Sequence, residues 1–156
     1  MRIKRFRASA GFGLLELMIV IVVVGLLATL AVPAYNGFVD KARIKSAIGD
    51  IGSLHIKLEE FRIKNNDQLP ANLNELNMDV PTDPWDQPYK YLNIQAAGPG
   101  AGGLRKDGRL NPLNTDYDLY SLGADGSSSL PLSAQASRDD IVRANNGAFI
   151  GLGEDY

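Results

Sequence analysis

The pattern of apolar and polar positions is dominated by a long apolar run near the N-terminus. Leu17 to Val32 carries no charged residue. Together with Leu14 and Leu15, the run is long enough to cross most of a lipid bilayer as a helix, which rises about 1.5 Å per residue. A basic leader, residues 1–11, precedes the run and has no acidic residue. One carboxylate, Glu16, lies just inside the N-terminal end of the run.

After this run, apolar residues recur every three or four positions between residues 44 and 61. This spacing places them on one stripe of a helix, while the charged residues lie mostly off the stripe. We therefore expect the helix to continue over residues 34–65 and to pack its stripe on a folded domain, ending near residues 65–67. Pro33 removes a backbone hydrogen bond, so we expect it to kink or locally unwind the helix. The stripe comprises Ile44, Ala47, Ile48, Ile51, Leu54, Leu58 and Phe61.

The remaining chain, residues 66–156, predicts a small domain rich in strands and turns. Asn72 is the expected cap of a short helix that ends at Leu76. Two strands are expected, one over the alternating Tyr89, Tyr91 and Ile94 and one over Tyr117–Leu122, with a hairpin turn at Asp107-Gly108. The expected fold class is therefore α+β, in which one long N-terminal helix packs on a small antiparallel β-sheet.

Three interpretations of the apolar run compete. A cleaved secretory signal needs a small-x-small site after the apolar part, and Val32-Pro33-Ala34-Tyr35 is a poor one. A plain membrane anchor leaves Glu16 as an unexplained cost of about 2.5–3.5 kcal/mol at membrane depth, less near the interface. In the third interpretation a peptidase cuts between Gly11 and Phe12, the helix is kept, and Glu16 lies four residues from a new amino terminus.

The Gly11-Phe12 junction, Glu16 and Pro33, in register with the apolar run, resemble the class III signal of type IV pilins and pseudopilins. In that family a peptidase removes the leader after the glycine, and the following phenylalanine is N-methylated. The resemblance implies that Glu16, at the fifth mature position, guides assembly. Gly13 departs from the family, which usually has Thr or Ser there. The family also implies a cytoplasmic N-terminus and a C-terminal domain outside the inner membrane.

The composition of the chain disfavours several classes of function. The chain has no cysteine, so no disulfide closes its C-terminal region as it does in many type IV pilins. Loss of the leader removes four basic residues and takes the net charge from −2 to about −6, which disfavours nucleic-acid binding. The sequence has one histidine, His55, and no serine in a nucleophile-elbow context, so we expect no enzyme.

Two further stretches resemble the major pseudopilin of type II secretion. Residues 83–89 read DPWDQPY, with Asp86 where the family has glycine, and residues 117–126 read YDLYSLGADG. In the family, a loop that begins at the second stretch binds calcium. By that resemblance, the Ca²⁺ ligands here are Asp125, Asp139, Asp140 and the Leu122 carbonyl. The alternative is that Asp125 makes a turn and the acidic pair caps a short helix. The loop over residues 126–138 is longer than usual, and residues 145–156 extend past the usual end.

These resemblances imply a subunit of the type II secretion pseudopilus, with four segments. They are a cleaved leader (1–11), a transmembrane and assembly helix (12–33), its amphipathic continuation (34–65) and a periplasmic β domain (66–156). Expected partners are copies of the same chain, minor pseudopilins, prepilin peptidase and the inner-membrane secretion platform. Two alternatives stay open: a type IV pilin-like subunit for adhesion, motility or DNA uptake, and a membrane-anchored calcium-binding module that never polymerises.

Overall fold

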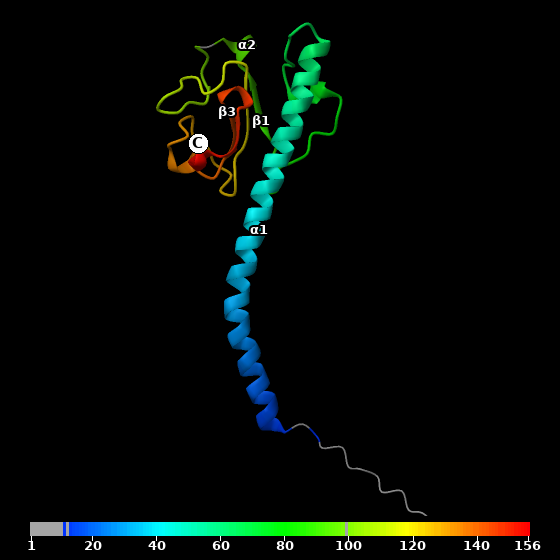
Figure 1. Cartoon of the computed structure of the whole chain (residues 1–156), viewed down its shortest axis with the longest axis vertical. Coiled ribbons are helices and arrows are strands. Elements are labelled where there is room, and N and C mark those ends of the chain that lie inside the picture. Colours follow the sequence, from blue (N-terminus) through cyan, green and yellow to red (C-terminus); the bar gives the residue numbers. More distant parts are fainter. Residues whose placement is uncertain (1–10, 12, 99) are drawn as a thin grey trace, which may run out of the picture. The chain divides into compact units, whose positions relative to one another are not determined.

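A computed structural model of the chain describes residues 11, 13–98 and 100–156. Its first element is helix α1, Leu14–Lys64, of 51 residues (Figure 1). The chain divides into two units, Met1–Asp40 and Lys41–Tyr156, and α1 contributes to both. The helix is unbroken through Pro33, so no unwinding occurs there, and a kink stays a prediction.

The C-terminal end of α1 lies where the sequence predicts it. Asn66 and Asp67 adopt positive φ angles of 55° and 67°, which a right-handed helix cannot continue through. The Asp67 backbone N–H donates to the Arg62 carbonyl at 2.9 Å, and the Asn65 side chain donates to the Phe61 carbonyl at 2.8 Å. These bonds satisfy carbonyls that the last turn leaves without a helical partner.

The second unit contains a four-stranded antiparallel sheet, and this confirms the α+β fold class. Its strands lie in sequence order, β1-β2-β3-β4. Tyr91 pairs with Leu119 between the first two strands, and Val142 pairs with Tyr120 and with Gly151 in the strands on either side of β3. The strands are β1 (Lys90–Asn93), β2 (Tyr117–Ser121), β3 (Ile141–Ala144) and β4 (Phe149–Leu152).

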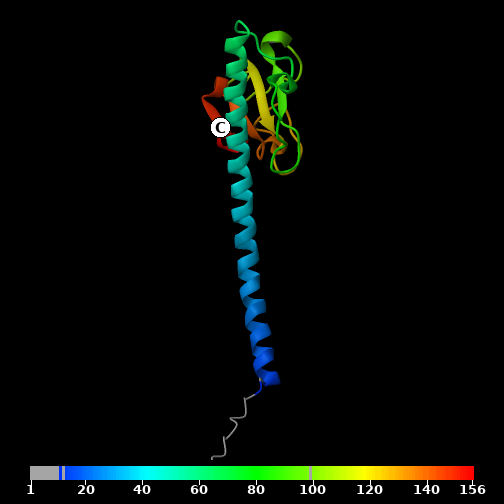
Figure 2. The same ribbon diagram turned by 90° about the vertical axis from the view of Figure 1, so that its right-hand side faces the viewer.

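The apolar stripe of α1 packs on this sheet, as predicted. Its fully buried members are Ala47, Ile51, Leu54 and Leu58. They form one core with Tyr117, Leu119 and Ile141 of the sheet and with residues of the connecting segments. Within the second unit, Figure 2 shows the strands running beside the C-terminal half of α1. Burial of each large apolar side chain contributes about 1.5–3 kcal/mol.

Short helices connect the strands. The predicted cap at Asn72 is confirmed, since its side chain accepts from the Asn74 N–H at 3.0 Å at the start of a 3₁₀ turn. The short helices are η1 (Leu73–Leu76), α2 (Ile94–Ala97), η2 (Gln135–Ser137), η3 (Asn145–Gly147) and η4 (Gly153–Asp155).

Two local predictions were wrong. Ile94 is not in the first strand: the Asn93 side chain accepts from the Ala96 N–H at 3.0 Å and starts α2, so the strand ends one residue earlier. Asp107-Gly108 does not join two strands. It lies in a loop, and the residue before it, Lys106, forms an isolated parallel bridge with Pro131. The extension over residues 145–156, which has no predicted role, forms η3, the edge strand β4 and η4.

Candidate functional site

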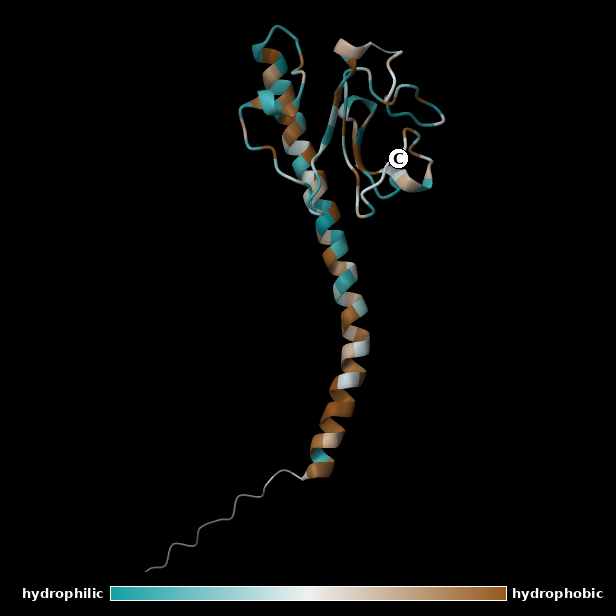
Figure 3. Cartoon of the chain, turned by 180° about the vertical axis from the view of Figure 1, so that it is seen from behind, coloured by the Kyte–Doolittle hydropathy of each residue, from teal (hydrophilic) through white to brown (hydrophobic). Residues whose placement is uncertain are grey.

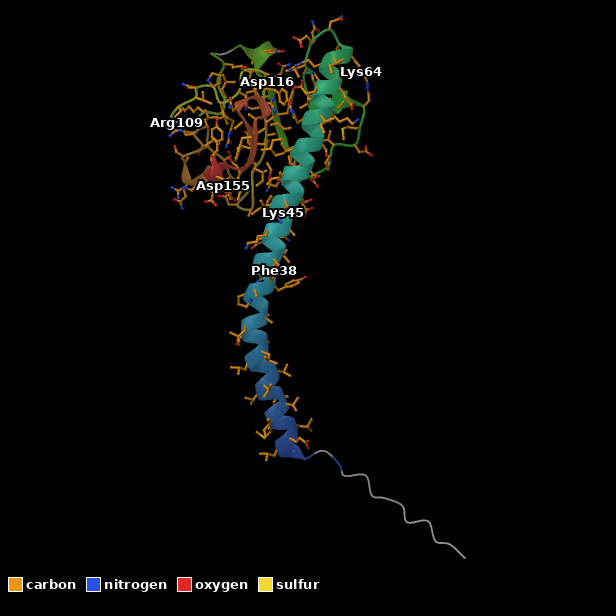
Figure 4. The ribbon with its side chains drawn as sticks, viewed as in Figure 1. Phe38, Lys45, Lys64, Arg109, Asp116 and Asp155 are labelled. Atoms are coloured by element: carbon orange, nitrogen blue, oxygen red, sulfur yellow. The ribbon has the colours of Figure 1, made fainter. Side chains whose placement is uncertain are left out.

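The first candidate site is the exposed N-terminal part of α1. Along the residues that Figure 3 colours mostly brown, none of the membrane-length apolar window is buried within the structure. Leu14 is 77% exposed and Phe38 72% exposed, and Figure 4 shows Phe38 projecting from the helix. This stretch is long and apolar enough to cross a membrane. Such a surface needs lipid or other helices to cover it, because soluble monomers rarely expose so much apolar area.

Glu16 is the one charged residue between Leu14 and Val39, and it is exposed in the first turn of α1. A carboxylate in the first turn interacts favourably with the positive end of the helix dipole. That interaction is small compared with the cost of placing a lone charge in an apolar environment. Glu16 is therefore suited to a cationic partner that lies outside the chain's own described residues.

The predicted cleavage junction lies partly outside the described residues. Phe12 and the basic leader up to residue 10 are not described, so cleavage and methylation stay predictions. Gly11 is exposed, and a Cβ added there would meet nothing within 4 Å. Among the described residues, therefore, nothing obstructs the glycine sterically.

The second candidate site is the acidic loop before β3. The Asp125 backbone N–H donates to Asp139 Oδ2 at 2.9 Å, so the structure brings these two residues together. Asp125 Oδ1 accepts from the Ser127 N–H at 2.7 Å, which makes the turn named in the alternative interpretation. Gly123 has φ 67°, and a Cβ there would collide with the Asp139 carbonyl oxygen. The glycine thus permits the close approach of the two ends of the loop.

The third predicted carboxylate, Asp140, turns into the protein interior. It is fully buried, and its Oδ2 lies 2.7 Å from Nη2 of Arg105, which is also buried. The Ser128 hydroxyl donates to the same oxygen at 2.5 Å. Burial raises the pKa of Asp140, while the Ser128 hydrogen bond and the Arg105 charge oppose that rise. Asp139 and Asp140 do not cap a helix, because strand β3 follows them directly.

This arrangement does not fit a calcium site that uses all three carboxylates. Calcium prefers several oxygen ligands that include more than one free carboxylate. Here a guanidinium already neutralises Asp140, and no three acidic, histidine or cysteine side chains gather as a metal site among the described residues. One feature points the other way: Asp140 Oδ1 is buried and has no hydrogen-bond partner among the described residues. Calcium binding therefore stays a prediction.

The DPWDQPY stretch forms a loop that Asp83 fastens to the sheet. Asp83 Oδ1 accepts from the backbone N–H groups of Trp85 and Gln87, and the Ser121 hydroxyl donates to its Oδ2 at 2.6 Å. Trp85 packs against the main core, as predicted for it. Asp86, where the resembling family has glycine, has φ 63° in the left-handed region. The stretch thus connects β2, through Asp83, with the core that includes α1, through Trp85.

A second buried ion pair lies on the helix side of the sheet. Arg143 Nη2 in β3 lies 2.6 Å from Asp116 Oδ2, and its guanidinium carbon stands 3.9 Å from the centre of the Tyr117 ring. Burial alone raises the pKa of Asp116, but the hydrogen bonds from Arg143 and from the backbone outweigh it, and the net shift is downward. His55 in α1 lies 2.5 Å from the Tyr117 hydroxyl. Burial and the nearby Arg143 charge lower the pKa of His55.

Sequence reasoning missed Arg105, Arg143, Asp116 and Asp118 as buried polar residues. Asp118 lies between Tyr117 and Leu119 in a predicted strand. Alternation along the strand places its side chain on the other face of the sheet from theirs and predicts that this side chain is exposed to solvent. Instead it is fully buried, and its carboxylate accepts from the Arg105 backbone N–H at 2.8 Å and from the Asn114 side chain at 2.8 Å. The covering segment, residues 104–114, has no strand or helix pattern that would have revealed a second buried face.

Comparisons with known proteins agree on one family. A family model described as the prokaryotic N-terminal methylation motif matches residues 6–32. The chain is 31% identical to type II secretion system core protein G of Pseudomonas aeruginosa, over 77% of this chain and 87% of that protein. It is 32% identical to the core protein G of Vibrio cholerae (79% and 86% covered) and of Escherichia coli K12 (74% and 82% covered). No solved structure matches the chain.

Proposed function

Because the chain belongs to the family of type II secretion system core protein G, the major pseudopilins, we propose that it is a structural subunit of the secretion pseudopilus. The apolar part of α1 holds the subunit in the inner membrane, with its N-terminus in the cytoplasm and residues 66–156 in the periplasm. Subunits then leave the membrane and polymerise into a short periplasmic fibre. The fibre helps to export folded proteins across the outer membrane.

The observation that carries this proposal is the fully exposed apolar helix with a single carboxylate near its start. Residues 14–38 have an apolar surface on all sides, whereas residues 47–58 bury only one stripe. A helix that is apolar all round is stable in lipid or in a bundle of like helices. The same segment therefore serves first as an anchor and then as the core of a fibre made from copies of this chain.

Processing supplies a cation close to Glu16. Cleavage after Gly11 by prepilin peptidase leaves the Phe12 amino group as the new N-terminus, four residues before Glu16. Methylation of that amino group keeps its positive charge. In a bundle of helices, the Glu16 carboxylate of one subunit pairs with the Phe12 ammonium of a neighbour, and the pairing offsets the cost of burying both charges.

The remaining partners follow from the family. They are minor pseudopilins and the inner-membrane secretion platform. The chain is in this scheme a substrate of a processing enzyme and a building block, and it has no catalytic task of its own.

Substitution of Glu16 tests the proposal. We expect Glu16→Val to insert into the membrane and to be cleaved normally, but to form few fibres and to support little secretion in a strain that lacks the wild-type gene. Glu60→Val is the matched control, because it makes the same change in the same helix, outside the apolar segment, and should leave fibres intact. Immunoblots for cleavage, electron microscopy of sheared fibres and assays of secreted proteins supply the readouts.

Normal fibres and secretion with Glu16→Val would contradict the proposed pairing. If deletion of the gene abolishes twitching motility but leaves secretion intact, the chain is a type IV pilin-like subunit instead. If neither fibres nor processing occur in the wild type, the membrane-anchored module is the better description.

A further inference from the structure

The buried side chains between the acidic loop and the sheet contain an arginine at the place where the family resemblance implies a metal ion. Arg105 is 2% exposed and Asp140 is fully buried. The two residues are 35 positions apart in the chain, and their charged groups meet at 2.7 Å. Such a pair persists in a protein interior only when the geometry is good, because each charge has lost its hydration.

The guanidinium of Arg105 contacts several segments that surround the loop. It donates to the hydroxyl of Ser128 near the start of the loop, and that hydroxyl donates in turn to Asp140 Oδ2 at the end of the loop. Its central carbon lies 4.3 Å from the centre of the Tyr120 ring in β2, within the range of a cation–π interaction. One cation thereby connects the sheet with the start and the end of residues 126–140.

The main chain of Arg105 is also held in place. Its N–H donates to Asp118 Oδ2 at 2.8 Å, and its carbonyl accepts from the Leu113 N–H at 2.7 Å. The Asn114 side chain fixes the other oxygen of Asp118 at 2.8 Å. The backbone of Arg105 is therefore fixed before its guanidinium meets Asp140. Because the backbone is fixed, less entropy is lost when the side chain is ordered.

The carboxylates of the other two predicted acidic ligands, Asp125 and Asp139, have protein partners as well. A backbone N–H donates to Asp139 Oδ2 and another to Asp125 Oδ1. A divalent cation beside Asp140 would face the fixed positive charge of Arg105 in a poorly solvated site, where like charges repel more strongly than in water. The one group that favours a bound cation is Asp140 Oδ1, which lacks a hydrogen-bond partner among the described residues.

We propose that Arg105 is a built-in cation that closes the loop over residues 126–140 in place of calcium. Calcium stabilises a fold by mass action, by an amount that grows with the logarithm of its free concentration above the dissociation constant. A covalently attached guanidinium provides its charge at every calcium concentration and at every pH of physiological interest. The folded state of this subunit is therefore independent of calcium. This inference concerns the second unit alone and holds whether or not the chain forms fibres.

Thermal unfolding of the full chain in detergent, followed by the fluorescence of Trp85, tests the inference without any mutation. We expect the same melting temperature in millimolar CaCl₂ and in EGTA, and the same rate of tryptic cleavage after the exposed Arg138. A melting temperature that rises by several degrees in CaCl₂, or cleavage that slows in it, overturns the inference.

Variants of Arg105 test the same point independently. Arg105→Met leaves Asp140 buried and unpaired, so we expect the melting temperature to fall by about 10 °C or more. Arg109→Met removes an exposed arginine nearby and should leave it unchanged. The double variant Arg105→Met with Asp140→Leu removes both charges and should recover most of the loss. A single Arg105→Met variant that melts like the wild type overturns the inference.

Discussion

Two arginine side chains, Arg105 and Arg143, lie inside the second unit with 2% and 1% of their surface exposed. Each pairs with one carboxylate and stacks on one tyrosine, and each leaves its Nε without a hydrogen-bond partner among the described residues. Burial of each Nε group without a hydrogen-bond partner lowers the stability of the folded protein. The pairs therefore help to specify the arrangement of the segments, and loss of one partner is far more damaging than loss of both.

His55 gives this interior a dependence on pH. Its ring contacts the Tyr117 hydroxyl, and the charges around it are Arg143, Arg62, Glu59 and Asp116. Burial comes first and the Arg143 charge second in lowering the pKa of His55 below 6.5, the value expected for the unfolded chain. As the pH falls through 6.5, the unfolded chain takes up a proton before the folded protein does. The stability that His55 contributes is thus fully present above this pH and is lost toward the lower, folded-state pKa.

The prediction is that the free energy of unfolding of the wild type falls between about pH 7.5 and pH 5.5 and that His55→Gln removes part of this fall. Glutamine keeps a hydrogen-bonding group near Tyr117 but does not titrate. Urea unfolding of the full chain in detergent, at both pH values, measures the difference. An equal fall in both proteins would show that His55 does not titrate differently in the folded state.

Among the elements, the loop over residues 83–89 shows how one position departs from its local preference. Asp86 occupies the left-handed region with φ 63°, where a side chain other than glycine is strained. Its N–H donates to the Asp83 carbonyl at 2.9 Å, and its side chain is exposed. The backbone turn alone therefore determines which residue suits this position.

We expect Asp86→Gly to raise the free energy of unfolding by about 0.5–1 kcal/mol, since relief of the left-handed strain exceeds the extra freedom of glycine in the unfolded chain. Asp86→Ala should lower it, because alanine tolerates this region less well than aspartate does. Denaturant unfolding of the three proteins gives the order directly. A glycine variant less stable than the wild type would show that the aspartate side chain has a role of its own.

An element could be predicted from the sequence where the pattern that indicates it lies within one segment of the chain. The stripe from Ala47 to Leu58 was predicted because helix periodicity is visible within one segment. Strand β3 was not, because all four residues of its Ile-Val-Arg-Ala sequence are buried and so it has no alternation. The Arg105–Asp140 pair joins residues that only the sheet topology brings together, and no spacing in the sequence encodes that contact.

At the scale of the whole molecule, the two units differ in what they need to be stable. The second unit buries its own core, and among its described residues three buried side-chain polar atoms have no hydrogen-bond partner. The described part of the first unit buries almost nothing and presents one carboxylate in an apolar surface. A chain of this kind reaches a stable state only when lipid or like helices cover residues 14–38, and this agrees with its membership of the core protein G family.

In the proposed function, α1 is kept after cleavage of the leader and becomes the assembly element. Intact-mass and N-terminal peptide mass spectrometry of the protein purified from its native membranes tests this most directly. We expect a mature chain that begins at Phe12, carries a methyl group on its amino terminus and retains the whole of α1. A chain that still begins at Met1, or one that begins after Val32, would contradict it.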